Sequence, residues 1–154
     1  MDHATRPGYS ALRKGRHSCP GGVYFITAVT HQRIPWFSEI SFARIMCRNL
    51  HHRRALADAE NLCSVVMPDH FHLPLQLRDV KLERVLNRLK SRSALLLNRE
   101  IGRKGRFWAP GFYDHALRKN EELISVARYI VANPLRAGLV RRLGDYPYWN
   151  AMWL

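Results

Sequence analysis

The chain has 154 residues, which suits one domain with a hydrophobic core and leaves little room for a second. Its 25 Lys and Arg residues against 12 Asp and Glu residues give a net charge of +13. This excess predicts a polyanionic partner, and nucleic acid fits best because Arg binds phosphate and stacks on bases; a basic surface that only keeps the protein in solution is the alternative. No apolar run could cross a bilayer and the N-terminus lacks a signal peptide's apolar core, so we expect a cytoplasmic protein.

Three segments are expected along the chain. Residues 1–21 are rich in Arg, Lys, Gly, Pro and Ser without apolar periodicity, which predicts a basic N-terminal arm that orders on DNA or remains a solvated tail. Residues 22–140 form the domain, and residues 141–154 form a C-terminal tail that packs on or near it. The three Cys residues are widely spaced and odd in number, which predicts reduced thiols rather than disulfides or a zinc ribbon.

The first half of the domain predicts three strands and one helix. Residues 23–30 are β-branched and aromatic, as is typical of a strand. Residues 38–54 carry apolar residues at near-helical spacing and begin with a Ser that can cap a helix. Residues 61–67 and 70–77 are apolar strands separated by a Pro-Asp dipeptide, which predicts a hairpin.

The second half predicts a helix, a strand and a last helix. Apolar residues recur at three- and four-residue steps over residues 81–102, which predicts a long amphipathic helix closed by Gly102. Residues 112–117 read as a short aromatic-rich strand. Asn120 caps the last helix, which should end near Asn133 because a proline follows.

This order predicts an α+β protein of the ferredoxin-like, split βαβ type. We expect a four-stranded antiparallel sheet with helices on one face and an appended C-terminal helix that carries Tyr129. The open face of such a sheet is available to a ligand, but function has to be argued from the site.

His70 and His72 provide the strongest chemical signal. Alternate residues of a strand leave the same face, so the two imidazoles should converge while Phe71 points into the opposite layer. Two convergent imidazoles form half of a metal site, and a divalent cation there would polarise a phosphodiester for attack by a nearby Tyr. Two histidines with satisfied ring nitrogens, in the core or at the surface, are the alternative.

Tyr129 and Asn133 are candidates for the second half of such a site. They lie four residues apart in the last predicted helix and therefore share a face, with Tyr129 at the border of the apolar stripe. The amide oxygen of Asn133 could serve as a third metal ligand, and Tyr129 could then attack within reach of the ion. A core-edge tyrosine and a helix C-cap are the alternative explanation.

Three segments resemble the REP-associated tyrosine transposases, relatives of the IS200-type single-tyrosine transposases. They are MPDHFH at residues 67–72, WAPGFYDH at residues 108–115 and YIVANPLRAGLV at residues 129–140. The resemblance covers roughly residues 10–154, including the GRHS arm and the YPY near the end, and is far more specific than any single motif.

The resemblance implies a single-stranded DNA endonuclease and strand transferase of the HUH class. His70 and His72 would hold Mg²⁺ or Mn²⁺, Asn133 would complete the site, and Tyr129 would be the nucleophile. The tyrosine would form a 5′-phosphotyrosyl link and release a 3′-hydroxyl, and the conserved bond energy would allow rejoining without ATP. The implied partner is a hairpin-forming DNA repeat with an adjacent short recognition sequence. We expect a monomer, with a homodimer as the alternative.

Nine cations are predicted to contact DNA, although a solvated charged surface would look the same in the sequence. They are Arg13, Lys14, Arg16, Lys90, Arg92, Arg103, Lys104, Arg106 and Arg118.

Pro74 is one departure from the pattern. It follows the histidines where an aliphatic residue is expected, and because proline lacks an N–H the strand pairing should be interrupted or bulged there. The competing function is therefore a catalytically inactive protein of the same family that binds DNA or RNA hairpins, which would tolerate Tyr129→Phe. A plasmid-type relaxase is disfavoured by the short chain.

Overall fold

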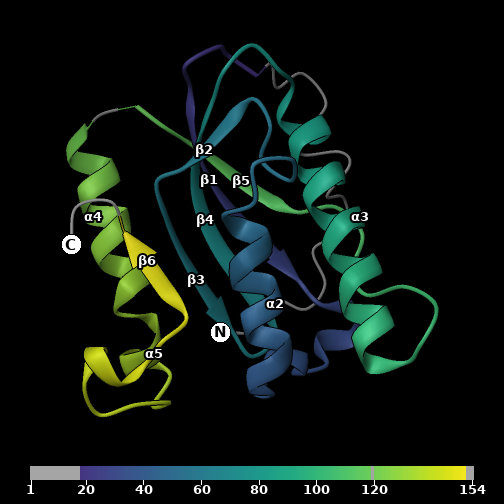
Figure 1. Cartoon of the computed structure of the whole chain (residues 1–154). Helices are drawn as coiled ribbons and strands as arrows, with labels where there is room; N and C mark the ends of the chain where they lie inside the picture. The colour runs from purple at the N-terminus through teal and green to yellow at the C-terminus, as the bar shows by residue number, and fades with distance from the viewer. Residues whose placement is uncertain (1–17, 119, 152–154) are drawn as a thin grey trace.

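The computed structural model describes residues 18–118 and 120–151 (Figure 1). The basic arm, with its predicted DNA contacts Arg13, Lys14 and Arg16, therefore lies outside the described residues. In chain order, the longer elements are β1 Val23–Val29, α2 Ile40–Leu50, β2 Ala59–Asn61, β3 Cys63–Met67, β4 His70–Leu77, α3 Leu82–Ile101, β5 Tyr113–Leu117, α4 Asn120–Val131, α5 Asn133–Arg136 and β6 Trp149–Ala151. Short 3₁₀ turns occupy His31–Arg33, Trp36–Ser38 and Leu143–Asp145.

The sheet has the strand order β5-β1-β4-β3-β6, with β2 pairing the far end of β4, and every pair is antiparallel. Helices α2 and α3 cover one face, and α4 lies on the other side, next to β3 and β6 (Figure 1). The predicted mixed fold with an antiparallel sheet is thus correct. The expectation of four strands is wrong because β2 and β6, each three residues long, extend the sheet to six.

The hairpin predicted at Pro68-Asp69 joins β3 to β4, and its register contains a bulge opposite Pro74. Between the pair Asn61↔Leu75 and the pair Val65↔His72, the segment with β2 and β3 advances four residues, whereas β4 advances three. The extra residue separates β2 from β3, so the single strand predicted over residues 61–67 is wrong at its start. Strand β4 nevertheless continues without a break through Pro74, because β1 pairs with it along its whole length.

Several predicted boundaries differ by a few residues. The first helix begins at Ile40 rather than at Ser38, which ends a 3₁₀ turn instead, and it stops at Leu50. The long helix α3 ends as predicted at Gly102, whose φ of 77° places it in the left-handed region that glycine tolerates. The last helix α4 ends at Val131, and the proline is accommodated in the first turn of the short helix α5.

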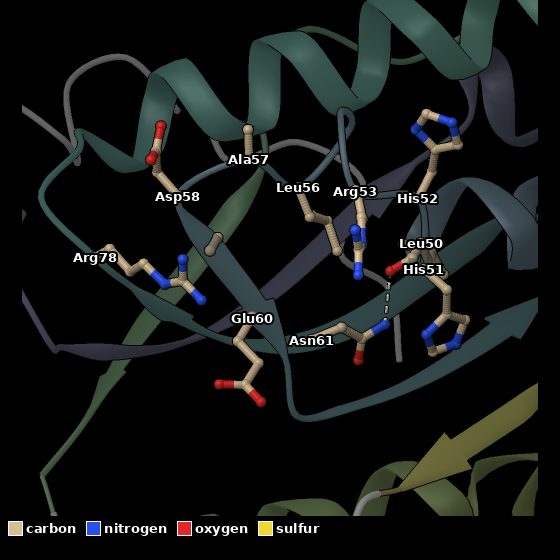
Figure 2. A pocket seen from close by; sticks show the side chains of 11 residues that line it. Leu50, His51, His52, Arg53, Leu56, Ala57, Asp58, Glu60, Asn61 and Arg78 are labelled. Carbon is tan, nitrogen blue, oxygen red and sulfur yellow. Dashed lines mark hydrogen bonds between the residues drawn. The ribbon is translucent and has the colours of Figure 1, made fainter.

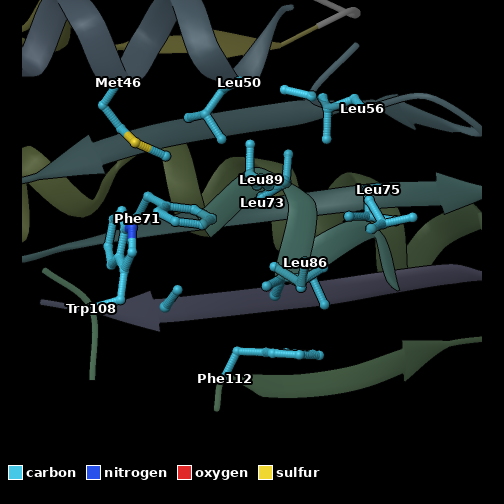
Figure 3. Packing of buried hydrophobic residues seen from close by; sticks show 14 of the residues in the cluster. Met46, Leu50, Leu56, Phe71, Leu73, Leu75, Leu86, Leu89, Trp108 and Phe112 are labelled. Atoms are coloured by element: carbon cyan, nitrogen blue, oxygen red, sulfur yellow. The ribbon is translucent and has the colours of Figure 1, made fainter. Parts of the chain in front are cut away.

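The main core lies between the sheet and the layer of α2 and α3. Phe71, Leu73 and Leu75 of β4 are completely buried against Met46 of α2 and Leu89 of α3, among other side chains (Figure 3). Burial of each such side chain contributes about 1.5–3 kcal/mol to folding. Because strand side chains alternate, this packing forces the neighbouring residues of β4, the two histidines included, onto the other face.

A second cluster attaches α4 to that other face. Ala127 and Ile130 of α4 pack against Val65 and Met67 of β3, and the Tyr146 hydroxyl donates a hydrogen bond to the Val66 carbonyl. The helix that carries Tyr129 is thereby fixed beside the histidine strand. Among the described helices, none combines the length and the apolar character required to span a membrane.

Candidate active site

The four predicted site residues line one cavity of about 360 Å³ where α4 and α5 meet the open face of the sheet. The strand β4 contributes His70 and His72, while the α4–α5 junction contributes Tyr129 and Asn133. The other lining residues are Thr27, Val29, Arg33 and Tyr113. The cavity thus joins residues up to 106 positions apart in sequence, Thr27 and Asn133 being the extremes.

The two imidazoles converge as the strand alternation predicted. The ring centroids of His70 and His72 are 4.8 Å apart, with the ring planes at 75°. Both side chains are partly buried on the face opposite the main core. Two imidazoles this close together are candidates to share one cation.

A carboxylate and a guanidinium orient His70. The Oδ1 atom of Asp69 lies 2.7 Å from Nδ1 of His70, and its Oδ2 lies 3.3 Å from NH1 of Arg33. The pKa of Asp69 is lowered, mainly by the hydrogen bond from His70 and further by the Arg33 charge. Asp69 is therefore an anion that holds the imidazole from behind, the arrangement that commonly fixes histidine ligands of metals.

A hydroxyl and an aromatic ring orient His72. The Thr27 Oγ1 atom, directly opposite in the β1–β4 ladder, lies 2.8 Å from Nδ1 of His72. The Phe25 ring stacks on the imidazole with centroids 5.3 Å apart. Burial, assisted by the charges of His70 and Arg136, lowers the pKa of His72 to about 3. His72 is thus neutral at physiological pH, the form that binds a metal ion.

Tyr129 lies at the mouth of the cavity with 51% of its surface exposed. The guanidinium carbon of Arg136 is 3.8 Å from the centre of its ring, and NH2 of Arg136 donates to the Tyr129 carbonyl at 2.6 Å. The same nitrogen is 3.2 Å from Oδ1 of Asn133. One arginine therefore ties the tyrosine and the asparagine together and places a positive charge beside the phenol.

The side chain of Asn133 retains unused hydrogen-bonding capacity. Its Nδ2 atom is buried without a hydrogen-bond partner in the described part of the chain. Its Oδ1 atom accepts from Arg136 and has a second lone pair that could bind an ion. A buried polar group without a partner is costly.

The donor set fits a divalent cation. The hydrogen bonds of both imidazoles use Nδ1, which leaves Nε2 of His70 and of His72 for a metal. Within residues 18–118 and 120–151, no group of three His, Cys, Asp or Glu side chains is arranged to hold an ion. A third protein ligand would therefore come from another residue type, and the Asn133 amide is in the same cavity.

Among the described residues, none of the predicted DNA-binding cations lines this cavity. Lys90 is anchored to the carbonyls of Ala109 and Gly111 at 2.9 and 2.6 Å, and burial lowers its pKa to about 8. Arg92 lies on the helix face, 3.2 Å from His52. Arg103, Lys104 and Arg106 lie in the loop after α3, where Lys104 and Arg106 are exposed. Arg118 directly follows β5.

Sequence reasoning missed Thr27, Arg33 and Arg136. Arg136 had a local signal, because it follows Asn133 by three residues and so shares its helical face. Thr27 and Arg33 had none, since each reaches the site through pairing with a distant segment.

A larger cavity of about 530 Å³ lies between the α2–β2 connection and Arg78 (Figure 2). Its lining includes the consecutive residues His51 and His52, but Figure 2 shows their rings pointing away from each other. It also mixes acidic and basic side chains. This cavity thus lacks the convergent donors that distinguish the site beside Tyr129.

Comparison with known proteins assigns the chain to a group. Residues 23–133 match the family model for IS200-like transposases. A Haemophilus influenzae protein described as a REP-associated tyrosine transposase is 26% identical over 145 residues, which cover 83% of this chain and 78% of that protein. The histidine strand and the whole of α4 lie within the matched residues.

Two solved structures share the fold. A REP-associated tyrosine transposase bound to a REP hairpin aligns with a TM-score of 0.70 and 23% identity, covering 87% of this chain and 79% of that one. A transposase structure from Deinococcus radiodurans aligns with a TM-score of 0.51 and 18% identity, covering 75% of this chain and 93% of that one.

Proposed function

This chain belongs to the IS200-like transposase family, and we propose that it is a metal-dependent endonuclease and strand transferase for hairpin-flanked single-stranded DNA. The observation that carries the proposal is the shared cavity of Tyr129, Asn133, His70 and His72. A tyrosine beside two oriented imidazoles and an amide has the parts that phosphodiester transfer requires: a nucleophile, ligands for a cation and a place for the phosphate.

In the proposed reaction, the phenolic oxygen of Tyr129 attacks the phosphorus of the scissile phosphodiester. The bond from phosphorus to the 3′-oxygen breaks, and that oxygen takes up a proton to become a 3′-hydroxyl, while the phenol gives up its proton. The 5′ end of the downstream strand remains attached to Tyr129. Attack of a 3′-hydroxyl on this link reverses the step, so strands are rejoined without another energy source.

His70, His72 and Asn133 would hold the divalent ion, Mg²⁺ or Mn²⁺, which when bound polarises the scissile phosphate. Asp69 and Thr27 fix the two imidazoles from behind, so little reorganisation is needed on binding. The guanidinium carbon of Arg136, 3.8 Å from the centre of the Tyr129 ring, places a positive charge beside the attacking group and the incoming phosphate.

The proposed substrate is a DNA hairpin formed by a repeat, next to a short recognition sequence. Two observations support it: the net charge of +13, and a relative of the same fold that was solved with a REP hairpin. We further propose that residues 1–21 act as a basic arm on residues 22–140, that the nine predicted cations contact phosphates, and that the protein acts as a monomer.

The test uses hairpin DNA with single-stranded flanks, labelled at either end, with Mg²⁺ or Mn²⁺. Wild-type protein should form a covalent adduct with the downstream fragment, and His70→Ala and Tyr129→Phe should form none. Tyr148→Phe is the matched control, because it removes a phenolic hydroxyl outside this cavity and should keep the adduct. Hairpin binding by all variants without any adduct would overturn the enzyme and leave a hairpin-binding protein.

A further inference from the structure

A second, smaller cavity of about 180 Å³ adjoins the proposed active site. The two cavities share Thr27, Val29, Arg33 and Tyr113, so the smaller one lies directly beside the cavity that Tyr129 lines. We infer that this second cavity is a base-binding subsite for a nucleotide that flanks the scissile phosphate. The inference rests on the proposed function and adds to it a determinant of sequence preference.

One wall of the subsite is the turn after β1, and it is held rigidly. The buried Thr30 hydroxyl shares its single proton between the carbonyls of Ile34 at 2.8 Å and Asp69 at 3.2 Å. The Thr30 amide donates to the Asp69 carbonyl at 2.9 Å, and the His31 amide to the Phe107 carbonyl at 2.9 Å. The turn is thus fixed both to itself and to the neighbouring segments.

The opposite wall is the turn before β5, and Lys90 holds it. The ammonium group of Lys90 donates to the carbonyls of Ala109 and Gly111, on either side of Pro110. The Ala109 amide in turn donates to the Val29 carbonyl at 2.9 Å. Both walls are therefore preorganised, which lowers the entropy cost of binding a ligand between them.

The first wall carries backbone strain. Gln32 and Arg33 have φ values of 56° and 52°, and two consecutive residues other than glycine rarely adopt this left-handed conformation. Such strain is typically retained where function requires it. Here it gives an exposed Gln32 a place in the lining of the subsite.

The chemistry of the lining favours a nucleobase. Pro110 and Tyr113 provide apolar and aromatic surface, on which an unstacked base can lie, and the buried Phe112 supports them from the main core. The Gln32 amide has both donor and acceptor atoms to bind a base edge. Arg33, ion-paired to Asp69 at the junction of the two cavities, places a cation beside the connecting backbone.

The experiment measures binding in a Tyr129→Phe background, where cleavage cannot occur. Labelled hairpins carry an abasic nucleotide at each flanking position in turn, and affinities are compared with and without Gln32→Gly. Glycine removes the amide and suits the left-handed backbone. Gln76→Ala, at the other end of β4, is the matched control.

The parent is the Tyr129→Phe protein. At one flanking position, removal of the base should lower the affinity of the parent for the hairpin by about tenfold, the value of one good base contact. The same change should hardly alter the affinity of the protein that also carries Gln32→Gly. The Gln76→Ala profile should follow the parent. Equal losses at every position, or no binding of the flanks at all, would overturn the subsite. If wild-type protein forms the covalent adduct but the parent and Gln32→Gly lose the same affinity at each abasic position, the subsite is overturned and the proposed cleavage stands. If the two proteins differ at one position but wild type forms no adduct, the subsite stands and the proposed cleavage is overturned.

Discussion

His72 and Thr27 face each other across the β1–β4 ladder, with the Thr27 hydroxyl 2.8 Å from Nδ1 of His72. The register of two strands thus decides which ring nitrogen remains for a metal. A one-residue shift in this pairing would turn the imidazole to the wrong face and remove its partner. The site therefore depends on the sheet as well as on its own residues.

Thr27→Val tests this relationship, because it keeps the shape of the side chain and removes the hydroxyl. We expect Mn²⁺ affinity to fall by about tenfold, since partners behind a ligating imidazole commonly contribute that much. Electron paramagnetic resonance titration of free Mn²⁺ measures it, with His72→Ala as the reference for loss of the site. Unchanged affinity would show that Thr27 does not orient the ring.

Asp69→Asn should also weaken Mn²⁺ binding, because the anion that holds His70 becomes neutral. Arg33→Gln is the matched comparison, since it removes the guanidinium on the other carboxylate oxygen and leaves the Asp69–His70 contact. We expect a clearly smaller effect from Arg33→Gln in the same titration. An equal or larger effect would contradict the role assigned to Asp69.

Lys90 should make stability depend on pH. Burial lowers its pKa in the folded state to about 8, from 10.5. The unfolded chain then binds more protons between these values, so stability rises with pH across this interval and the penalty is full below pH 8. The urea midpoint of wild type, taken relative to that of Lys90→Met, should rise from about pH 8 to 10.5. A flat or falling difference would contradict the shift.

The three thiols should react at different rates. Cys19 is exposed, whereas burial raises the pKa of Cys47 to about 11 and that of Cys63 to about 12. At pH 8 an aromatic disulfide reagent should label one thiol quickly in the native protein and all three after denaturation. Cys19→Ser should abolish the fast phase. A fast phase that persists in that variant would contradict the burial of the other two.

The features predicted correctly from sequence are those set by local periodicity. Alternation along β4 placed His70 and His72 on one face, and the three- and four-residue steps of α3 predicted a helix that ends at Gly102. The Pro68-Asp69 dipeptide predicted the hairpin because it is a local turn signal. In each case, the relevant contacts lie within one or two neighbouring elements.

The features missed depend on contacts between distant segments. Strand β6 is three residues long and exists because it pairs with β3, 88 positions earlier at the pair Cys63↔Ala151. Arg33 reaches the site only because Thr30 is tied to Asp69. No local pattern signals such pairings, and short strands are specified mainly by their partners.

Tyr129 is the proposed nucleophile, and peptide mapping of the covalent adduct identifies the residue that carries the DNA. Trypsin cuts after Arg128 and Arg136, which isolates residues 129–136 with Tyr129 as the single tyrosine, while Tyr113 falls in residues 107–118. After incubation with hairpin DNA and Mg²⁺ or Mn²⁺, followed by nuclease digestion, we expect the nucleotide mass on the 129–136 peptide. A modified 107–118 peptide, or no modified peptide with either ion, would contradict the account.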